Sequence, residues 1–310
     1  MVSIAIDFGG SSIKLAVVKN GEILNREVVA TKKGKGIRAH LSLIENAIKK
    51  LMSRIDVPIE GIGIAFAGLV DSNNKRVISV NKKYEDALEF DFKEWINSRF
   101  GLPVILENDA NAALLGEVSY GSARGYKDAV ILILGTGVGT AAIMEEKLIR
   151  GKHFQAGCLC GHFAIPGNER DCSCGKKGCL EASASGWALP IIYKERNSEI
   201  SDSEIIDFKF LEKAVLSEDE IATDILTEFT DVWSATAKNL VHAYDPEVVV
   251  LSGGVIKCGD MVIEPIIKKT KESVWTAWGE IEFVVSENPE DSVLLGLHSI
   301  LEKGECINVI

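Results

Sequence analysis

The chain has 310 residues, 46% of them apolar, and a formal net charge of −11 at neutral pH. This length suffices for one large or two ordinary domains, and no apolar run is long enough to cross a bilayer. The acidic balance argues against nucleic-acid binding, which needs clustered Lys and Arg, and no signal peptide or helix-turn-helix is visible. We therefore expect a cytoplasmic globular protein without nucleic-acid or membrane partners.

A glycine turn follows the first predicted strand. Residues 4–8 are apolar except for Asp7, Gly9 and Gly10 form the turn, and two more strands joined by a tight turn follow. Turns of this kind expose backbone N–H groups, which are suited to binding phosphate oxygens. Taken alone, a glycine turn is more often an ordinary hairpin turn than a phosphate site.

The next part of the chain alternates between predicted helices and strands. Apolar residues three and four apart favour a helix over 41–55, and a shorter helix over 92–100 is closed by Gly101. Between the two helices, residues 61–71 predict a buried strand that runs into a loop.

Asn108 and Asp109 end the strand predicted over 103–109. In open α/β sheets ligands bind beyond the carboxyl ends of strands, so this position favours a role in chemistry. The segment Ala110–Glu117 that follows is helix-prone, and either polar residue also suits its N-cap. Taken alone, the pair is more often a cap than a catalytic pair.

The glycine turn recurs near the centre of the chain. An apolar run from Ala129 ends in Gly135-Thr136-Gly137-Val138-Gly139, and residues 141–144 and 148–149 predict two more strands. An apolar run bounded by a turn indicates a strand buried on both faces. Two hairpins of the same plan predict two similar lobes whose turns face each other across a cleft. The expected ligand of that cleft is a nucleoside triphosphate.

A cluster of cysteines follows the second hairpin. His162, Cys172, Cys174 and Cys179 have the spacing His-x9-Cys-x-Cys-x4-Cys, and thiolate and imidazole ligands in this number favour zinc over disulfides in a reducing compartment. Four protein ligands leave no open coordination position, so we interpret the Zn²⁺ site as structural.

Three further residues lie near this cluster in the sequence. Cys158 and Cys160 are either core residues or replace one of the four ligands. Glu181 directly follows the ligand region, where its carboxylate can accept hydrogen bonds from a polyhydroxylated substrate.

The last third of the chain continues the alternation. Ser217-Glu-Asp-Glu220 is a capping box that opens a helix through Tyr244, and residues 247–255 predict a buried strand. That strand ends in a third glycine turn at Gly253 and Gly254, where missing side chains let a flat base or ribose approach. The remaining predicted elements are a helix over 259–274 with a kink or restart at Pro265, a short strand over 281–285 and a helix over 293–301.

Together these motifs resemble the ROK family of sugar kinases and sugar-sensing repressors, in the same order and over essentially the whole chain. The segments that carry the resemblance are Asp7-Phe-Gly-Gly with Lys14, Glu107-Asn-Asp-Ala-Asn111, Gly135-Thr-Gly-Val-Gly139, Gly161-His162, the Cys-x-Cys-Gly-x-x-Gly-Cys-x-Glu run ending at Glu181, and Leu251-Ser-Gly-Gly-Val255. The cysteine run and the Glu-Asn-Asp-Ala-Asn segment are the most specific, since actin-like ATPases in general share the glycine turns.

The resemblance implies an α/β protein with the two-lobed actin-like (ribonuclease H-like) ATPase fold, with ATP and sugar in the interlobe cleft. It implies a small N-terminal lobe of residues 1–113 and 292–310. The large C-terminal lobe, residues 114–291, would carry the zinc-bound loop. A homodimer or homotetramer is the expected assembly.

The resemblance also assigns roles to individual residues. It implies that Asp109 is the catalytic base that takes the proton from the attacking sugar hydroxyl. The implied sugar ligands are Asn108, His162, Glu181, Asn81 and Gly68. The implied ligands of ATP and Mg²⁺ are Asp7, Gly9, Gly10, Ser11, Lys14, Gly135, Thr136, Gly137, Gly253 and Gly254, with Asp7 holding the cation through water. Positioning and charge neutralisation are expected to supply most of the rate of phosphoryl transfer.

The sequence departs from the family pattern at the sugar pocket. Family kinases usually carry Glu-x-Gly-His, whereas residues 156–162 here are Ala-Gly-Cys-Leu-Cys-Gly-His. An ungapped match places Leu159 at the glutamate position, and a one-residue insertion places Cys158 there. Neither side chain accepts two hydroxyl hydrogen bonds as a carboxylate does. In addition, residues 66–68 lack a proline that is frequent in the family, and residues 81–95 keep Asn81 but lose the Pro-Gly-Trp pattern.

We therefore expect an ATP-dependent kinase of a sugar, amino sugar or cyclic polyol with an atypical sugar pocket, for which glucose is a poor substrate. The alternative is a catalytically weak, sugar-sensing member of the family without a DNA-binding domain. A third possibility is an actin-like ATPase that acts on proteins, a role in which the zinc run has no evident use.

Overall fold

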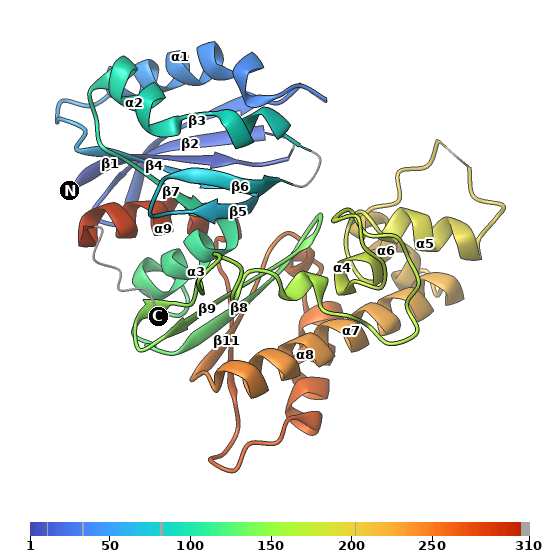
Figure 1. The fold of residues 1–310 in the computed structure, drawn as a ribbon. Helices are drawn as coiled ribbons and strands as arrows, with labels where there is room; N and C mark the ends of the chain where they lie inside the picture. The colour runs from blue at the N-terminus through green and yellow to red at the C-terminus, as the bar shows by residue number, and fades with distance from the viewer. Residues whose placement is uncertain (11, 33, 81–82, 202, 305–310) are drawn as a thin grey trace. The chain divides into compact units, whose positions relative to one another are not determined.

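The chain divides into two compact units in the computed structural model (Figure 1). The first comprises residues 1–127, 145–156 and those from 287 onward, and the second comprises residues 128–144 and 157–286. The boundary predicted at residue 113 differs from this division, because it cuts a helix that belongs as a whole to the first unit. The residues described are 1–10, 12–32, 34–80, 83–201 and 203–304. No helix among them is both long and apolar enough to span a membrane.

The first unit is built on a five-stranded mixed sheet with the order β3-β2-β1-β4-β7. Its strands are β1 (Val2–Phe8), β2 (Ser12–Lys19), β3 (Glu22–Ala30), β4 (Gly61–Phe66) and β7 (Val104–Asn108). β1 pairs antiparallel with β2 and parallel with β4, which pairs parallel with β7. Almost every residue of β1 and β4 is buried, as expected for central strands covered on both faces. The three parallel strands therefore end at one edge of the sheet.

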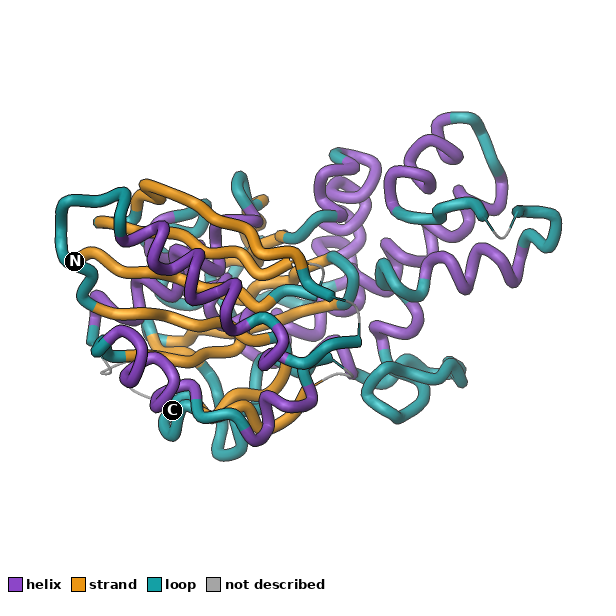
Figure 2. Tube along the Cα trace, turned by 90° about the horizontal axis from the view of Figure 1, so that it is seen from above, coloured by secondary structure: helices purple, strands orange, loops and turns teal. Residues whose placement is uncertain are grey.

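Helices cover both faces of this sheet (Figure 1). α1 (Leu41–Met52) and α2 (Phe92–Phe100) lie on one face, nearest the viewer in Figure 2, and α3 (Asp109–Tyr120) and α9 (Pro289–Lys303) lie on the other. The smaller elements are the hairpin of β5 (Gly68–Asp71) and β6 (Arg76–Val80), the 3-10 helices η1 (Ile37–Ala39) and η2 (Glu85–Glu89), and β10 (Lys147–Leu148).

Small residues allow α3 and α9 to pack backbone against backbone. A β-carbon on Gly116 would collide with the carbonyl group of Ser292, and one on Gly296 would collide with that of Ala112. Such close contact leaves the two helices little freedom to slide. It therefore fixes the position of α3, whose first residue is Asp109.

Among the described residues of the second unit, the strands lie in the order β9-β8-β11-β12. They are β8 (Ala129–Leu134), β9 (Val138–Met144), β11 (Val248–Ser252) and β12 (Glu282–Val285). β8 pairs antiparallel with β9 and parallel with β11, and β11 pairs parallel with β12. The helices are α4 (Leu180–Ser183), α5 (Leu189–Arg196), α6 (Phe208–Leu216), α7 (Glu220–Tyr244) and α8 (Asp260–Ser273), with the 3-10 helices η3 (Cys160–His162) and η4 (Val255–Cys258).

The predicted long helices and buried strands are confirmed, with shifted ends. α7 is capped by Asp219, whose side chain accepts a hydrogen bond from the Ala222 N–H, so the cap predicted at Ser217 is wrong. Pro265 lies inside α8, which continues through it. The sequence does not predict the β5–β6 hairpin, α5 or α6, because elements this short give little periodic signal.

Candidate active site

Asp109 follows the carboxyl end of β7 as the first residue of α3. Its Oδ1 accepts hydrogen bonds from the Ala110 N–H at 2.9 Å and from Asn108 Nδ2 at 3.1 Å. Asn108 Oδ1 accepts from the Asn111 N–H at 3.0 Å and thereby caps α3, which confirms the cap interpretation. Asn108 Nδ2 also donates to the carbonyl oxygen of Gly68 at 2.9 Å. Asn108 therefore both caps the helix and orients the Asp109 carboxylate.

The electrostatic surroundings of Asp109 favour its neutral form. Burial raises the pKa of Asp109 to about 7, and the negative charge of Asp7 adds to the shift. Burial also raises the pKa of Asp7 to about 6, while Lys14, its cross-strand partner on β2, lowers it. A carboxyl group with a pKa near neutrality is suited to exchange a proton at physiological pH.

A buried ion pair supports the end of β7. Arg150 donates to Glu107 Oε2 from Nε at 3.0 Å and from Nη2 at 2.6 Å. The two residues are only 5% and 1% exposed. Glu107 Oε1 accepts from the Asn108 N–H and from Asn111 Nδ2, both at 2.9 Å. The network links the guanidinium to the backbone of the residue that orients Asp109.

Side chains from elsewhere in the first unit hold its glycine turn. The Tyr84 hydroxyl donates to the Gly9 carbonyl oxygen at 3.0 Å, and the Thr31 hydroxyl donates to that of Gly10 at 3.3 Å. The Tyr84 ring is buried edge-on against Phe8. Neither hydroxyl lies in a recognisable motif, so the sequence does not predict these two anchors. Ser11 and Asn81, predicted ligands of nucleotide and sugar, lie outside the described residues.

The glycine turn of the second unit is held by the backbone of Gly186 and Trp187 and lies against α4. The Gly186 N–H donates to the Gly135 carbonyl oxygen at 2.9 Å, and the Trp187 N–H donates to that of Thr136 at 3.0 Å. A β-carbon on Gly137 would collide with the Glu181 carboxylate on α4. Only glycine therefore fits at position 137 without displacing Glu181.

Glu181 is almost fully engaged within the protein. Its Oε2 accepts from the Val138 N–H at 3.0 Å, and its Oε1 accepts from the Ser173 hydroxyl at 3.1 Å and from Trp187 Nε1 at 3.0 Å. The side chain is 8% exposed. It thus ties the glycine turn to the cysteine-rich loop. The sequence predicts only a sugar contact for Glu181, and these three bonds are not among its expected roles.

The four predicted metal ligands lie together. One donor atom from each of His162, Cys172, Cys174 and Cys179 falls within 4.8 Å of all the others. Cys174 Sγ and Cys179 Sγ are 3.7 Å apart, and Cys172 Sγ lies 3.6 Å from His162 Nδ1. Sulfurs at the usual zinc–sulfur distance on a tetrahedral ion would be about 3.8 Å apart. The donor set and its spacing therefore fit tetrahedral zinc.

Cys158 and Cys160 are not members of this cluster among the described residues. Cys160 is buried, and its thiol points to the Gly157 carbonyl oxygen at 3.6 Å. The Cys160 N–H donates to the Thr140 hydroxyl at 3.2 Å. Burial accordingly raises the pKa of the Cys160 thiol, which argues for a core residue. Leu159 immediately precedes η3 and is partly exposed.

The two glycines of the third turn have different surroundings. A β-carbon on Gly253 would collide with the backbone of Leu134 at the end of β8, and its φ of +98° also favours glycine. A β-carbon on Gly254 would meet no other atom within 4 Å. Strand packing thus accounts for Gly253, whereas Gly254 leaves room for a ligand.

The chain is similar to known proteins over nearly its whole length. The model of the ROK family matches residues 3–303. The chain is 29% identical to a glucokinase of Thermotoga maritima over 97% of both chains. It is 30% identical to a xylose repressor of Bacillus spizizenii over 78% of this chain and 60% of the repressor. A solved ROK family glucokinase from Streptomyces griseus, in complex with glucose and AMPPNP, matches with a TM-score of 0.84 and 29% identity over 98% of this chain and 100% of that one. The predicted actin-like ATPase fold is thereby confirmed.

Proposed function

This chain belongs to the ROK family and is an ATP-dependent sugar kinase, and we propose that it phosphorylates a sugar, amino sugar or cyclic polyol with Asp109 as the base. The observation that carries the assignment of Asp109 is its place after β7, with Oδ1 held by Ala110 and Asn108. Oδ2 has no hydrogen-bond partner within the described residues and is the oxygen we assign to proton transfer.

In the proposed step, Asp109 Oδ2 takes the proton of the sugar hydroxyl. The hydroxyl oxygen bonds to the γ-phosphorus, and the bond between the γ-phosphorus and the oxygen that leaves with ADP breaks. A pKa of about 7 lets Asp109 be ionised before transfer and release the proton afterwards. Asp7 has the hard carboxylate chemistry that suits water-bound Mg²⁺, and the cation would neutralise phosphate charge. The backbone N–H groups of the two glycine turns are proposed to bind the phosphates.

We assign sugar binding to Asn108, His162 and Glu181, which differ in the atoms they have left to hydrogen-bond a sugar hydroxyl. Asn108 Nδ2 already donates to two oxygens, so a sugar hydroxyl would donate to its Oδ1. His162 directs Nδ1 towards Cys172, which leaves Nε2 for a hydroxyl if Nδ1 binds zinc. Zinc would act structurally by fixing this imidazole and the loop to α4.

We further propose that the sugar pocket differs from that of glucose-specific kinases. Leu159 and Cys158, the two candidates for the missing glutamate position, cannot supply a carboxylate. Glu181 already accepts three hydrogen bonds and has limited capacity to compensate for that loss. The preferred substrate is therefore a polyol that does not need this carboxylate.

Ligand sensing with weak catalysis is a second candidate function. The absent glutamate and the similarity to a xylose repressor favour it. A coupled ADP-release assay with magnesium, over glucose, mannose, N-acetylated hexosamines, fructose, allose and inositols, separates the two functions. The kinase proposal expects transfer to at least one compound, with a loss of rate in Asp109→Asn. Sugar binding without phosphoryl transfer, at the same affinity in the wild type and in Asp109→Asn, would support sensing.

A further inference from the structure

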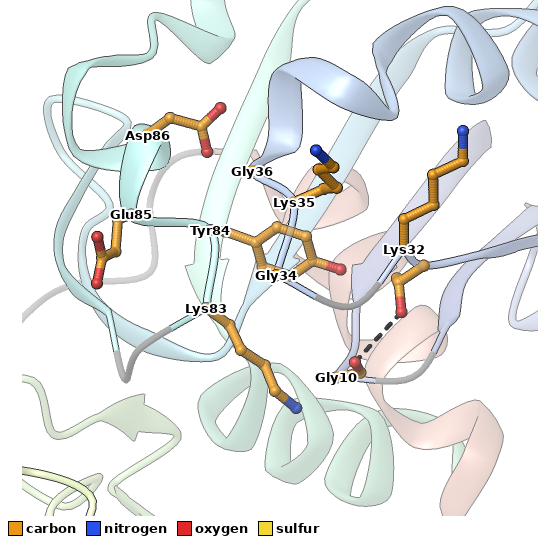
Figure 3. A pocket seen from close by; sticks show the side chains of 10 residues that line it. Gly10, Lys32, Gly34, Lys35, Gly36, Lys83, Tyr84, Glu85 and Asp86 are labelled. Atoms are coloured by element: carbon orange, nitrogen blue, oxygen red, sulfur yellow. Dashed lines mark hydrogen bonds between the residues drawn. The ribbon is translucent and has the colours of Figure 1, made fainter.

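A cavity of about 910 Å³ in the first unit opens onto the first glycine turn (Figure 3). Its walls include Gly10, Thr31, Tyr84 and the three lysines Lys32, Lys35 and Lys83. None of the roles assigned above uses the lysines. A basic wall beside a turn suited to phosphate indicates an anionic ligand.

Lys83 is the lysine that lies at the turn itself. Its Nζ occupies the space that a β-carbon on Gly10 would take, so the ammonium group lies directly against the Gly10 backbone. Figure 3 shows the Lys83 side chain extended towards the Gly10 side of the cavity. The ammonium of Lys35 lies on the other side of the Tyr84 ring in this view.

The nearby acidic residues do not neutralise Lys83. The Asp86 carboxylate accepts hydrogen bonds from the Ile37 N–H at 2.7 Å and the Arg38 N–H at 3.0 Å. The Glu85 and Asp86 carboxylates both point away from the Lys83 ammonium (Figure 3). Lys83 makes no ion pair within the described residues. Its charge is therefore available to a ligand at Gly10.

The anchors of the turn also favour a ligand at this place. The Gly9 and Gly10 carbonyl oxygens accept from Tyr84 and Thr31, respectively. Because described peptide bonds are trans, the Gly10 N–H points away from the Gly9 carbonyl oxygen and hence from the Tyr84 hydroxyl. The turn thus directs its carbonyl groups to protein donors and leaves an N–H donor for phosphate.

We propose that Lys83 binds the terminal phosphate of the nucleotide at Gly10 and neutralises its charge during transfer. This inference rests on the proposed kinase function and adds a residue to the same site. Lys83 takes no part in bond making or proton transfer. Its flexible stem lets the ammonium follow the phosphoryl group as it moves to the sugar oxygen.

The experiment compares Lys83→Met with Lys35→Met, a matched variant in the same cavity. Binding of AMPPNP and of ADP is measured by calorimetry with magnesium present. We expect Lys83→Met to weaken AMPPNP about tenfold or more, the effect of losing a charge-assisted hydrogen bond, and to leave ADP within about twofold. Lys35→Met should leave both affinities within about twofold, and Lys83→Arg should retain most of the AMPPNP affinity. Melting curves check that each variant is folded.

Kinetic measurements give a second readout. Lys83→Met should lower kcat and raise KM for ATP, with KM for the sugar unchanged. Equal losses of AMPPNP and ADP affinity, or no loss of either, would overturn the role of Lys83. If the wild-type protein binds AMPPNP through Lys83 but phosphorylates no polyol, the kinase proposal fails and the phosphate contact stands. If Lys83→Met is as active as the wild type, only the Lys83 inference falls.

Discussion

The guanidinium of Arg150 donates twice to one carboxylate oxygen of Glu107, at 3.0 and 2.6 Å, and both side chains are buried. The other oxygen of Glu107 accepts from the Asn108 N–H and from Asn111 Nδ2. Arg150 therefore balances a charge that would otherwise be buried next to the proposed catalytic residue.

We predict that Arg150→Met destabilises the protein by roughly 3 to 5 kcal/mol, because it leaves the Glu107 carboxylate buried without a cation. Urea-induced unfolding of the wild type and of the variant measures this loss. The double variant Glu107→Gln with Arg150→Met should recover part of it, since no unpaired charge remains. A loss below about 1 kcal/mol for the single variant would mean that Glu107 is protonated or hydrated after the change.

Asp109→Asn tests the proposed base. Asparagine keeps the shape of the side chain and cannot take the proton, so kcat should fall by about 10²- to 10⁴-fold. The affinity for nucleotide should change little, because the bonds to Oδ1 can be kept. The melting temperature should also change little at pH 5, where Asp109 is already neutral. A variant that retains more than about a tenth of kcat would remove Asp109 from the mechanism and leave the fold assignment unaffected.

The raised pKa values also predict how activity and stability depend on pH. The ordinary value is 3.8, whereas Asp7 has a pKa of about 6 and Asp109 one of about 7 in the folded protein. The folded state therefore binds more protons than the unfolded state between these values, so these residues lower stability as pH rises from about 4 to 7. By contrast, kcat/KM should rise through about pH 7 as Asp109 ionises.

Urea midpoints at pH 5 and pH 8, measured without magnesium, check the stability part. The drop between the two pH values should be smaller in Asp109→Asn, which has lost one of the two groups. A pH–rate profile checks the activity part. If kcat/KM falls only well below pH 6, a different environment surrounds Asp109 in the working enzyme.

How far the sequence predicts this site depends on how local each interaction is. Asn108 and Asp109 are identified because a strand end and a cap are both local patterns, and the four metal ligands because most of them share one short run. Arg150 is missed because its partner Glu107 is 43 residues away. A carboxylate inside a buried strand was the only available signal, and it specifies neither which cation pairs with it nor where.

The same reasoning applies to Glu181 and Tyr84. The motif places Glu181 beside the metal ligands, but only the fold brings Val138 and Trp187 to its two oxygens. Tyr84 reaches Gly9 across 75 residues of sequence. Contacts of this length depend on strand order, which periodicity alone does not give.

The metal cluster predicts a specific pattern of cysteine variants. Cys174 is exposed, so without a metal its replacement by serine should change stability by less than about 0.5 kcal/mol. With zinc bound, Cys174→Ser should reduce the metal content from about one ion per chain and lower the melting temperature. Cys258→Ser is the matched control. Cys258 lies outside the cluster, so this variant should keep the metal of the cluster. Equal metal content in all three proteins would rule out the proposed ligand set.

The departure at the sugar pocket predicts the substrate preference. Loss of a carboxylate that accepts sugar hydroxyls should cost a glucose-type ligand about 1.5 to 3 kcal/mol, or about 10- to 160-fold in kcat/KM. Glucose should therefore be a poor substrate relative to the best compound of the panel. Leu159→Glu and Cys158→Glu, made separately, test the two candidate positions. One of them should raise kcat/KM for glucose by about tenfold or more, with KM for ATP unchanged. A wild-type protein that already prefers glucose would show that another group, such as Glu181, supplies the missing contact.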